Sequence, residues 1–92
     1  MAEEGTWVEE SVVVKSAQGL HARPARIVWE KARRYVSQVR IVKGRVDIDA
    51  KSIFDIMTLD ATAGTELVVR AMGSDAKAAV QALVELLGSE LD

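Results

Sequence analysis

The spacing of apolar residues before one short stretch, residues 17–24, differs from the spacing after it. Over residues 6–16, apolar and polar side chains alternate imperfectly, which indicates a half-buried strand. Over residues 25–36, apolar side chains recur at the i, i+3, i+4, i+7 spacing of an amphipathic helix. The expected core face of this helix consists of Ala25, Val28, Trp29, Ala32 and Val36. The chain therefore has to pass from a strand into a helix within residues 17–24.

The same two periods recur further along the chain and predict its remaining elements. Residues 38–43 and 46–51 alternate on either side of Gly44, which favours a β-hairpin, and residues 67–71 predict a fourth strand. A final helix begins at Ser74 or Asp75 and ends before Gly88, which stands where a helix C-terminal glycine belongs. Its expected buried stripe consists of Ala76, Ala79, Val80, Leu83, Leu86 and Leu87.

The resulting order, with a short helix after Ser52, is β-α-β-β-α-β-α. It predicts an α+β fold, an open-faced β-sandwich in which a four-stranded antiparallel sheet carries three helices on one face. We expect residues 1–92 to form a single domain, since the chain is too short for two cores. Residues 1–6 are expected to be a flexible N-terminal extension.

Composition excludes several classes of function. A net charge of −2 argues against nucleic-acid binding, and zero cysteines with one histidine leave almost nothing from which to build a metal site. The first residues are acidic where a secretory signal would be basic, and the apolar runs are far shorter than the ~20 residues of a membrane span. We therefore expect a cytoplasmic monomer without metal, cofactor or membrane insertion.

The only histidine and the only proline lie together in residues 19–25, Gly-Leu-His-Ala-Arg-Pro-Ala. A lone histidine is often only structural, but His21 stands at an expected helix start, where Pro24 fits the first turn. The backbone N–H groups of Ala22 and Arg23 and the Arg23 guanidinium would stabilise a phosphoryl group on the imidazole. The field of a helix start also favours the neutral, nucleophilic ring. These residues predict a stoichiometric phosphoryl relay, with a non-covalent anion-binding regulatory module as the alternative.

Residues 19–25, together with Lys-Ser-Ile-Phe-Asp-Ile-Met-Thr-Leu at residues 51–59 and Gly64, closely resemble the histidine-containing phosphocarrier proteins (HPr) of the bacterial phosphoenolpyruvate-dependent phosphotransferase system. The resemblance extends from about Trp7 to Leu87. It implies the same open-faced sandwich that the periodicity predicts.

The resemblance also implies a function. Enzyme I would phosphorylate His21, with Arg23 assisting, and the phosphate would pass to EIIA components for sugar uptake. Such a carrier holds a transient phosphohistidine and is not by itself a turnover enzyme. Asp60 stands where these proteins frequently have glycine, and in this respect the chain resembles the nitrogen-related branch of the family. The alternative is therefore a nitrogen- or carbon-regulatory carrier that delivers its phosphate to a regulatory EIIA-like acceptor.

Ser52 has two compatible interpretations. With Asp55 it has the form of a capping box, in which the serine hydroxyl caps a helix. The resemblance implies a regulatory phosphorylation site for a dedicated serine kinase. Asp55 stands where many of those proteins have glycine, and its negative charge would oppose an added phosphate.

Four apolar residues near the histidine are candidates for partner docking. Ile27, Ile53, Phe54 and Met57 could simply form the inner face of the helices that carry them. The resemblance implies instead a shared docking surface for Enzyme I and EIIA proteins beside His21.

Overall fold

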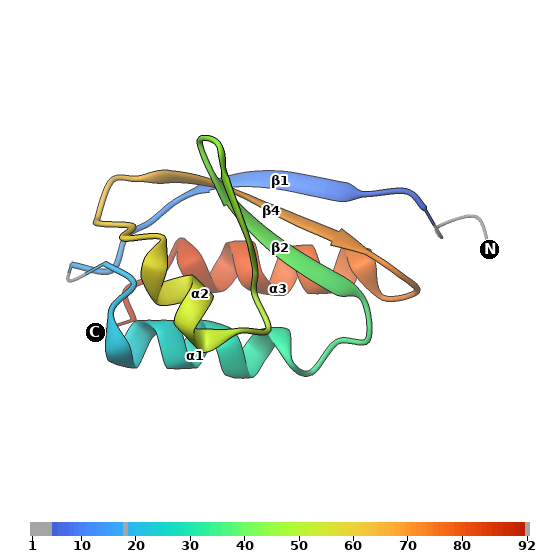
Figure 1. The fold of residues 1–92 in the computed structure, drawn as a ribbon, viewed down its shortest axis with the longest axis horizontal. Helices are drawn as coiled ribbons and strands as arrows, with labels where there is room; N and C mark the ends of the chain where they lie inside the picture. Colours follow the sequence, from blue (N-terminus) through green and yellow to red (C-terminus); the bar gives the residue numbers. More distant parts are fainter. Residues whose placement is uncertain (1–4, 18, 92) are drawn as a thin grey trace.

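The computed structural model describes residues 5–17 and 19–91, and its elements follow the predicted order (Figure 1). They are β1 (Val8–Val13), α1 (Ala22–Ala32), β2 (Gln38–Lys43), β3 (Val46–Asp49), α2 (Ile53–Thr58), β4 (Glu66–Met72) and α3 (Ala76–Leu87). Most of the expected N-terminal extension, residues 1–4, lies outside the described residues.

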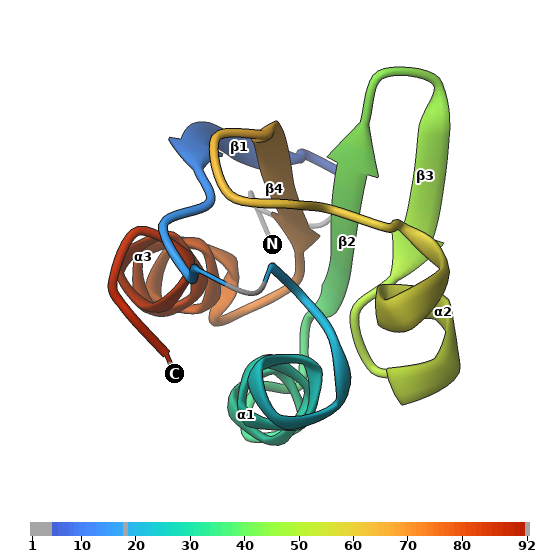
Figure 2. The ribbon, with the colours of Figure 1, turned by 90° about the vertical axis from the view of Figure 1, so that its left-hand side faces the viewer.

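The four strands form one antiparallel sheet in the order β1-β4-β2-β3, so β4 pairs with β1 on one side and β2 on the other (Figure 2). Val12 stands opposite Leu67 across the β1–β4 pair, and Ile41 stands opposite Val69 across the β2–β4 pair. All three helices cover the same face of the sheet, which leaves the other face open (Figure 1). The α+β open-faced sandwich is therefore confirmed.

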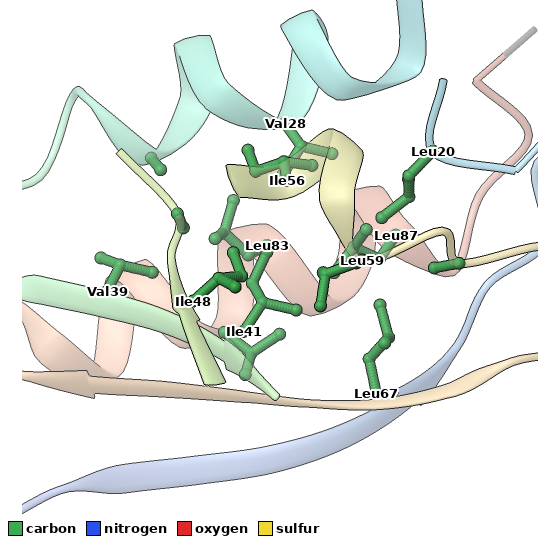
Figure 3. Packing of buried hydrophobic residues seen from close by; sticks show 14 of the residues in the cluster. Leu20, Val28, Val39, Ile41, Ile48, Ile56, Leu59, Leu67, Leu83 and Leu87 are labelled. Atoms are coloured by element: carbon green, nitrogen blue, oxygen red, sulfur yellow. The ribbon is translucent and has the colours of Figure 1, made fainter. Parts of the chain in front are cut away.

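The core lies between the sheet and the helices (Figure 3). Leu67 of β4 and Ile41 of β2 point from the sheet towards the helices, where Leu83 of α3 lies, and all three residues are fully buried. Val28 of α1 packs near Ile56 of α2 in the same cluster (Figure 3). Burying each such side chain stabilises the fold by about 1.5–3 kcal/mol, so the alternating strands and the helix stripes hold each other in place.

Some expected details are wrong. Val36 is 76% exposed, because α1 ends at Ala32 and the chain has already turned towards β2. Leu86 is only partly buried. Gly88 is the C-cap of α3, as predicted, but its φ of −84° means that the helix ends without the left-handed turn for which a glycine is favoured.

Candidate functional site

His21 is the N-cap of α1, with extended backbone angles of φ −92° and ψ −158°. Its imidazole is exposed and makes no capping hydrogen bond to the helix. Ser, Thr, Asp and Asn are the usual N-caps because their side chains satisfy helix N–H groups. His21 leaves those N–H groups available, and its ring stands free at the surface at the start of the helix.

The segment before His21 is anchored to the chain around Ala61. Leu20 is buried, and its N–H donates to the Ala61 carbonyl at 2.9 Å. Gly19 has φ +71°, and a Cβ there would lie 2.5 Å from the same carbonyl oxygen. Only glycine permits both the backbone angle and this close approach. Because Pro24 and Ala25 are buried on the other side, His21 is presented from a base fixed at both ends.

Two backbone donors remain free in the first turn of α1. The Ala25 N–H donates to the His21 carbonyl at 2.7 Å, and Pro24 has no N–H. The N–H groups of Ala22 and Arg23 are therefore the ones that lack an intrahelical partner. The first turn contains no acidic residue, and the Arg23 side chain is exposed. The helix dipole, two N–H groups and a guanidinium together favour an anion at this helix start.

Ser52 is the N-cap of α2, as its sequence context predicts. Its hydroxyl accepts a hydrogen bond from the Asp55 N–H at 3.3 Å. Its own N–H donates to the Asp49 carbonyl at 3.0 Å. In a full capping box the Asp55 side chain would accept a hydrogen bond from the Ser52 N–H. Because the Asp49 carbonyl accepts from that N–H instead, the box is only half formed.

The four expected docking residues divide into two pairs. Phe54 is 76% exposed and Met57 is 42% exposed, whereas Ile27 and Ile53 are partly buried against the core. The helices that carry them, α1 and α2, lie in contact side by side (Figure 2). The inner-face interpretation therefore holds for the two isoleucines, and Phe54 and Met57 form an exposed apolar surface.

The end of α2 is held by contacts that local sequence patterns do not reveal. The Lys43 ammonium, on β2, donates to the carbonyls of Leu59 and Asp60 at 2.9 and 3.2 Å. Asp60 has φ +51°, the left-handed region that glycine adopts without cost. This angle gives a physical reason for a glycine at position 60, and aspartate is one of the few other residues that tolerate it.

Asp75 is a second unpredicted feature, at the start of α3. Its carboxylate accepts hydrogen bonds from the Val36 N–H at 3.0 Å, from the Ser37 N–H at 3.0 Å and from the Ser37 hydroxyl at 2.5 Å. Burial by itself raises the pKa of Asp75, but the combined effect of these hydrogen bonds, which lower it, is larger. The pKa of Asp75 therefore lies below its ordinary value of 3.8. The starts of α3 and α1 lie at opposite ends of the molecule, so this carboxylate stabilises the fold away from the histidine (Figure 1).

Residues 5–17 and 19–91 contain no group of three histidine, cysteine or acidic side chains placed to hold a metal ion. In the same part of the chain, none of the helices has both the length and the apolar character needed to cross a bilayer.

Known proteins resemble this chain in both sequence and fold. A family model described as the PTS HPr component phosphorylation site matches residues 8–89. The phosphocarrier protein HPr of Borreliella burgdorferi is 34% identical over 82 residues, which cover 89% of this chain and 95% of that relative. HPr of Haemophilus influenzae is 36% identical over 78 residues, which cover 85% of this chain and 92% of the relative.

Two further similarities concern a differently named relative and a solved structure. The HPr-like protein Crh of Bacillus subtilis is 34% identical over 84 residues, which cover 91% of this chain and 99% of the relative. The crystal structure of HPr from Bacillus anthracis superposes with a TM-score of 0.87 at 34% identity, covering 90% of this chain and 99% of that one.

Proposed function

Because this chain belongs to the HPr family of phosphocarrier proteins, we propose that it carries a phosphoryl group on His21. In this proposal His21 receives the group from phosphorylated Enzyme I and passes it to EIIA components for sugar uptake. The observation that supports it best is an exposed imidazole at a helix N-cap, where no capping bond engages the ring and two backbone N–H groups remain free.

The transfer needs only the lone pair of a neutral imidazole nitrogen. That nitrogen attacks phosphorus, a new P–N bond forms, and the bond from phosphorus to the donor protein breaks with its electron pair going to the donor. The attacking nitrogen carries no proton, so no base has to remove one from it. The chain is thus a stoichiometric carrier, and the reverse sequence of bond changes delivers the group to the acceptor.

The groups around His21 stabilise the phosphate without burying it. The N–H groups of Ala22 and Arg23 and the Arg23 guanidinium would donate hydrogen bonds to its oxygens. Because His21 is exposed, the labile P–N bond stays within reach of the next protein. We infer that this balance, between holding the anion and exposing it, suits a carrier better than a hydrolase.

Phe54 and Met57 are proposed to be the exposed part of the docking surface, with Ile27 and Ile53 beneath them. An exposed aromatic and a methionine on one short helix are the side chains that protein interfaces favour. We infer that Enzyme I and EIIA proteins use the same surface in turn. We propose that the exchange takes place in the cytoplasm and that the chain acts as a monomer.

Incubation with phosphoenolpyruvate and a catalytic amount of Enzyme I tests the proposal. Intact-mass analysis should show one added phosphoryl group that is acid-labile and absent in His21→Ala. Arg23→Ala should still accept the group, but roughly 10- to 100-fold more slowly, because a charged hydrogen-bond donor is lost. Phosphate bound reversibly, without a change of mass, would favour the non-covalent anion-binding module and refute the carrier.

Ser52 remains a candidate for regulatory phosphorylation by a serine kinase, alongside its capping role. A phosphate there would stand at the start of α2, one turn from the Asp55 carboxylate, whose negative charge opposes it. Asp55→Gly, which removes that charge, should be phosphorylated faster than the wild-type chain by a kinase specific for this serine. Equal, undetectable modification of both proteins would remove Ser52 as a switch.

A regulatory carrier is the second candidate, and two observations favour it. Asp60 occupies a glycine-like conformation, and HPr-like Crh proteins are among the relatives. The two candidates differ in the acceptor. Phosphorylated chain should transfer its phosphoryl group faster to a sugar-specific EIIA than to a regulatory EIIA-like protein, and the opposite order would establish the second candidate.

A further inference from the structure

The side chain of Trp29 connects α1 to the segment that enters α2. Its indole N–H donates to the carbonyl of Lys51 at 3.1 Å, and Lys51 directly precedes the N-cap Ser52. The indole is partly buried against the core. The guanidinium of Arg33 lies over its ring, 4.5 Å from the centroid, which restrains the ring from the solvent side.

A second contact ties the same segment to the end of α1. The Lys51 ammonium donates to the Tyr35 carbonyl at 2.6 Å, and the Lys51 N–H donates to the Asp49 carboxylate at 2.9 Å. The indole bond and the ammonium bond thus hold Lys51 from two places on or just beyond α1. We call these two bonds the Trp29–Lys51 clamp.

Helix α2 depends on such contacts for its position. It has only six residues, and isolated helices of that length do not form in water. Its side chains Phe54 and Met57 point to solvent, so they add little to holding it. Ile56 anchors α2 in the core and Lys43 holds its far end, so what remains to be fixed is the start of the helix, which Lys51 ties to α1. The position of Phe54 and Met57 relative to His21 therefore depends in part on that start.

We propose that Trp29 is a positioning residue for phosphotransfer: by binding the Lys51 carbonyl, its indole fixes α2, and with it Phe54 and Met57, relative to His21. This inference rests on the proposed function, since it assigns the docking surface to the phosphoryl donor and acceptor. Trp29 itself does not have to touch either partner. Its loss should therefore weaken docking and leave the chemical step at the imidazole intact.

Two variants test the clamp and a third serves as the matched control. Trp29→Phe keeps a ring but removes the N–H donor, and Lys51→Met keeps the side-chain stem but removes the ammonium. Trp7→Phe also removes an indole stacked on an arginine, since Trp7 lies 4.4 Å from the Arg70 guanidinium. That arginine is on β4, in the sheet. Both clamp variants should raise the KM for phosphorylated Enzyme I about fivefold, the effect of one lost hydrogen bond, with kcat unchanged.

Amide hydrogen exchange provides a readout that does not depend on the phosphotransfer function. The N–H groups of Asp55 and Ile56 bind the Ser52 hydroxyl and carbonyl, so their exchange reports opening of the first turn of α2. In Trp29→Phe these two amides should exchange about fivefold faster than in the wild-type chain. The Ala79 N–H, which binds the Asp75 carbonyl in α3, should keep its rate.

The outcomes distinguish the positioning role of Trp29 from the proposed phosphocarrier function. An unchanged KM together with unchanged exchange at Asp55 and Ile56 in both clamp variants would overturn the positioning role. Equal acceleration at Ala79 would overturn it as well, because the loss would then be one of global stability. If the wild-type chain accepts no phosphate, the proposed function fails, and the exchange rates alone still decide whether the clamp holds α2.

Discussion

Removal of the Asp75 carboxylate should destabilise the fold by an amount that the structure bounds. Ser37 is 2% exposed, and both its hydroxyl and its N–H donate to this carboxylate. Asp75→Ala would leave both donors unsatisfied at about 1–1.5 kcal/mol each, or about 2–3 kcal/mol together. The Val36 N–H is exposed and can bind water instead, so it adds little. For a chain of this length the melting temperature should fall by roughly 15 °C.

The same carboxylate makes stability depend on pH. Its pKa in the folded chain lies below the ordinary 3.8, so as the pH falls the unfolded chain binds the proton first. The stabilisation is complete above about pH 5 and is lost as the pH falls through the folded-state pKa, below 3.8. Asp75→Asn has no charge to lose, and this contribution should vanish from its pH profile.

Urea denaturation at pH 7 and at pH 3 measures both effects. The wild-type midpoint should exceed that of Asp75→Asn at pH 7, and the difference should shrink at pH 3 with equal m-values. A difference that is the same at both pH values would refute the assignment of the pH-dependent stability to this carboxylate.

Two further changes have outcomes that the structure predicts. Gly19→Ala should lower the free energy of unfolding by about 2 kcal/mol, because the substitution forces a left-handed backbone angle on an L-residue and its Cβ meets the Ala61 carbonyl. It should also slow the phosphorylation of the chain. An unchanged urea midpoint together with an unchanged phosphorylation rate would contradict this. Asp47→Asn should cost about 1 kcal/mol at low salt, because Arg40 and Arg70 stand opposite each other across β2 and β4 and both contact Asp47, at 2.8 and 3.6 Å. The loss should shrink in 1 M salt, as measured by thermal unfolding, and a loss independent of salt would argue against charge repulsion.

The helix after the histidine shows how far local patterns reach. Ala25, Val28 and Ala32 are buried as their spacing predicts, but Val36 continues the same spacing and is exposed. The chain leaves the helix because the N–H groups of residues 36 and 37 bind the carboxylate of Asp75, almost forty positions away. No pattern within one helix turn carries that information.

The candidate site divides in the same way. The sequence predicts His21 at a helix start, free N–H groups beside it and a serine cap on the short helix, since each depends on residues within one turn. Gly19 belongs to the sequence motif around the histidine, but its close approach to the Ala61 carbonyl is a contact that only the folded chain creates. The capping of α2 by Lys43 likewise depends on a distant strand.

By itself, the sequence determined the order of elements and the α+β class and predicted His21 as the phosphoryl acceptor, because apolar periodicity and helix starts are properties of neighbouring residues. Only the tertiary structure decided the strand order β1-β4-β2-β3, the anchoring of the segment before His21, and the exposure of Phe54 and Met57 beside the partly buried Ile27 and Ile53. These features depend on which distant groups compete for the same buried volume and the same hydrogen-bond partners, and that competition is settled when the chain packs.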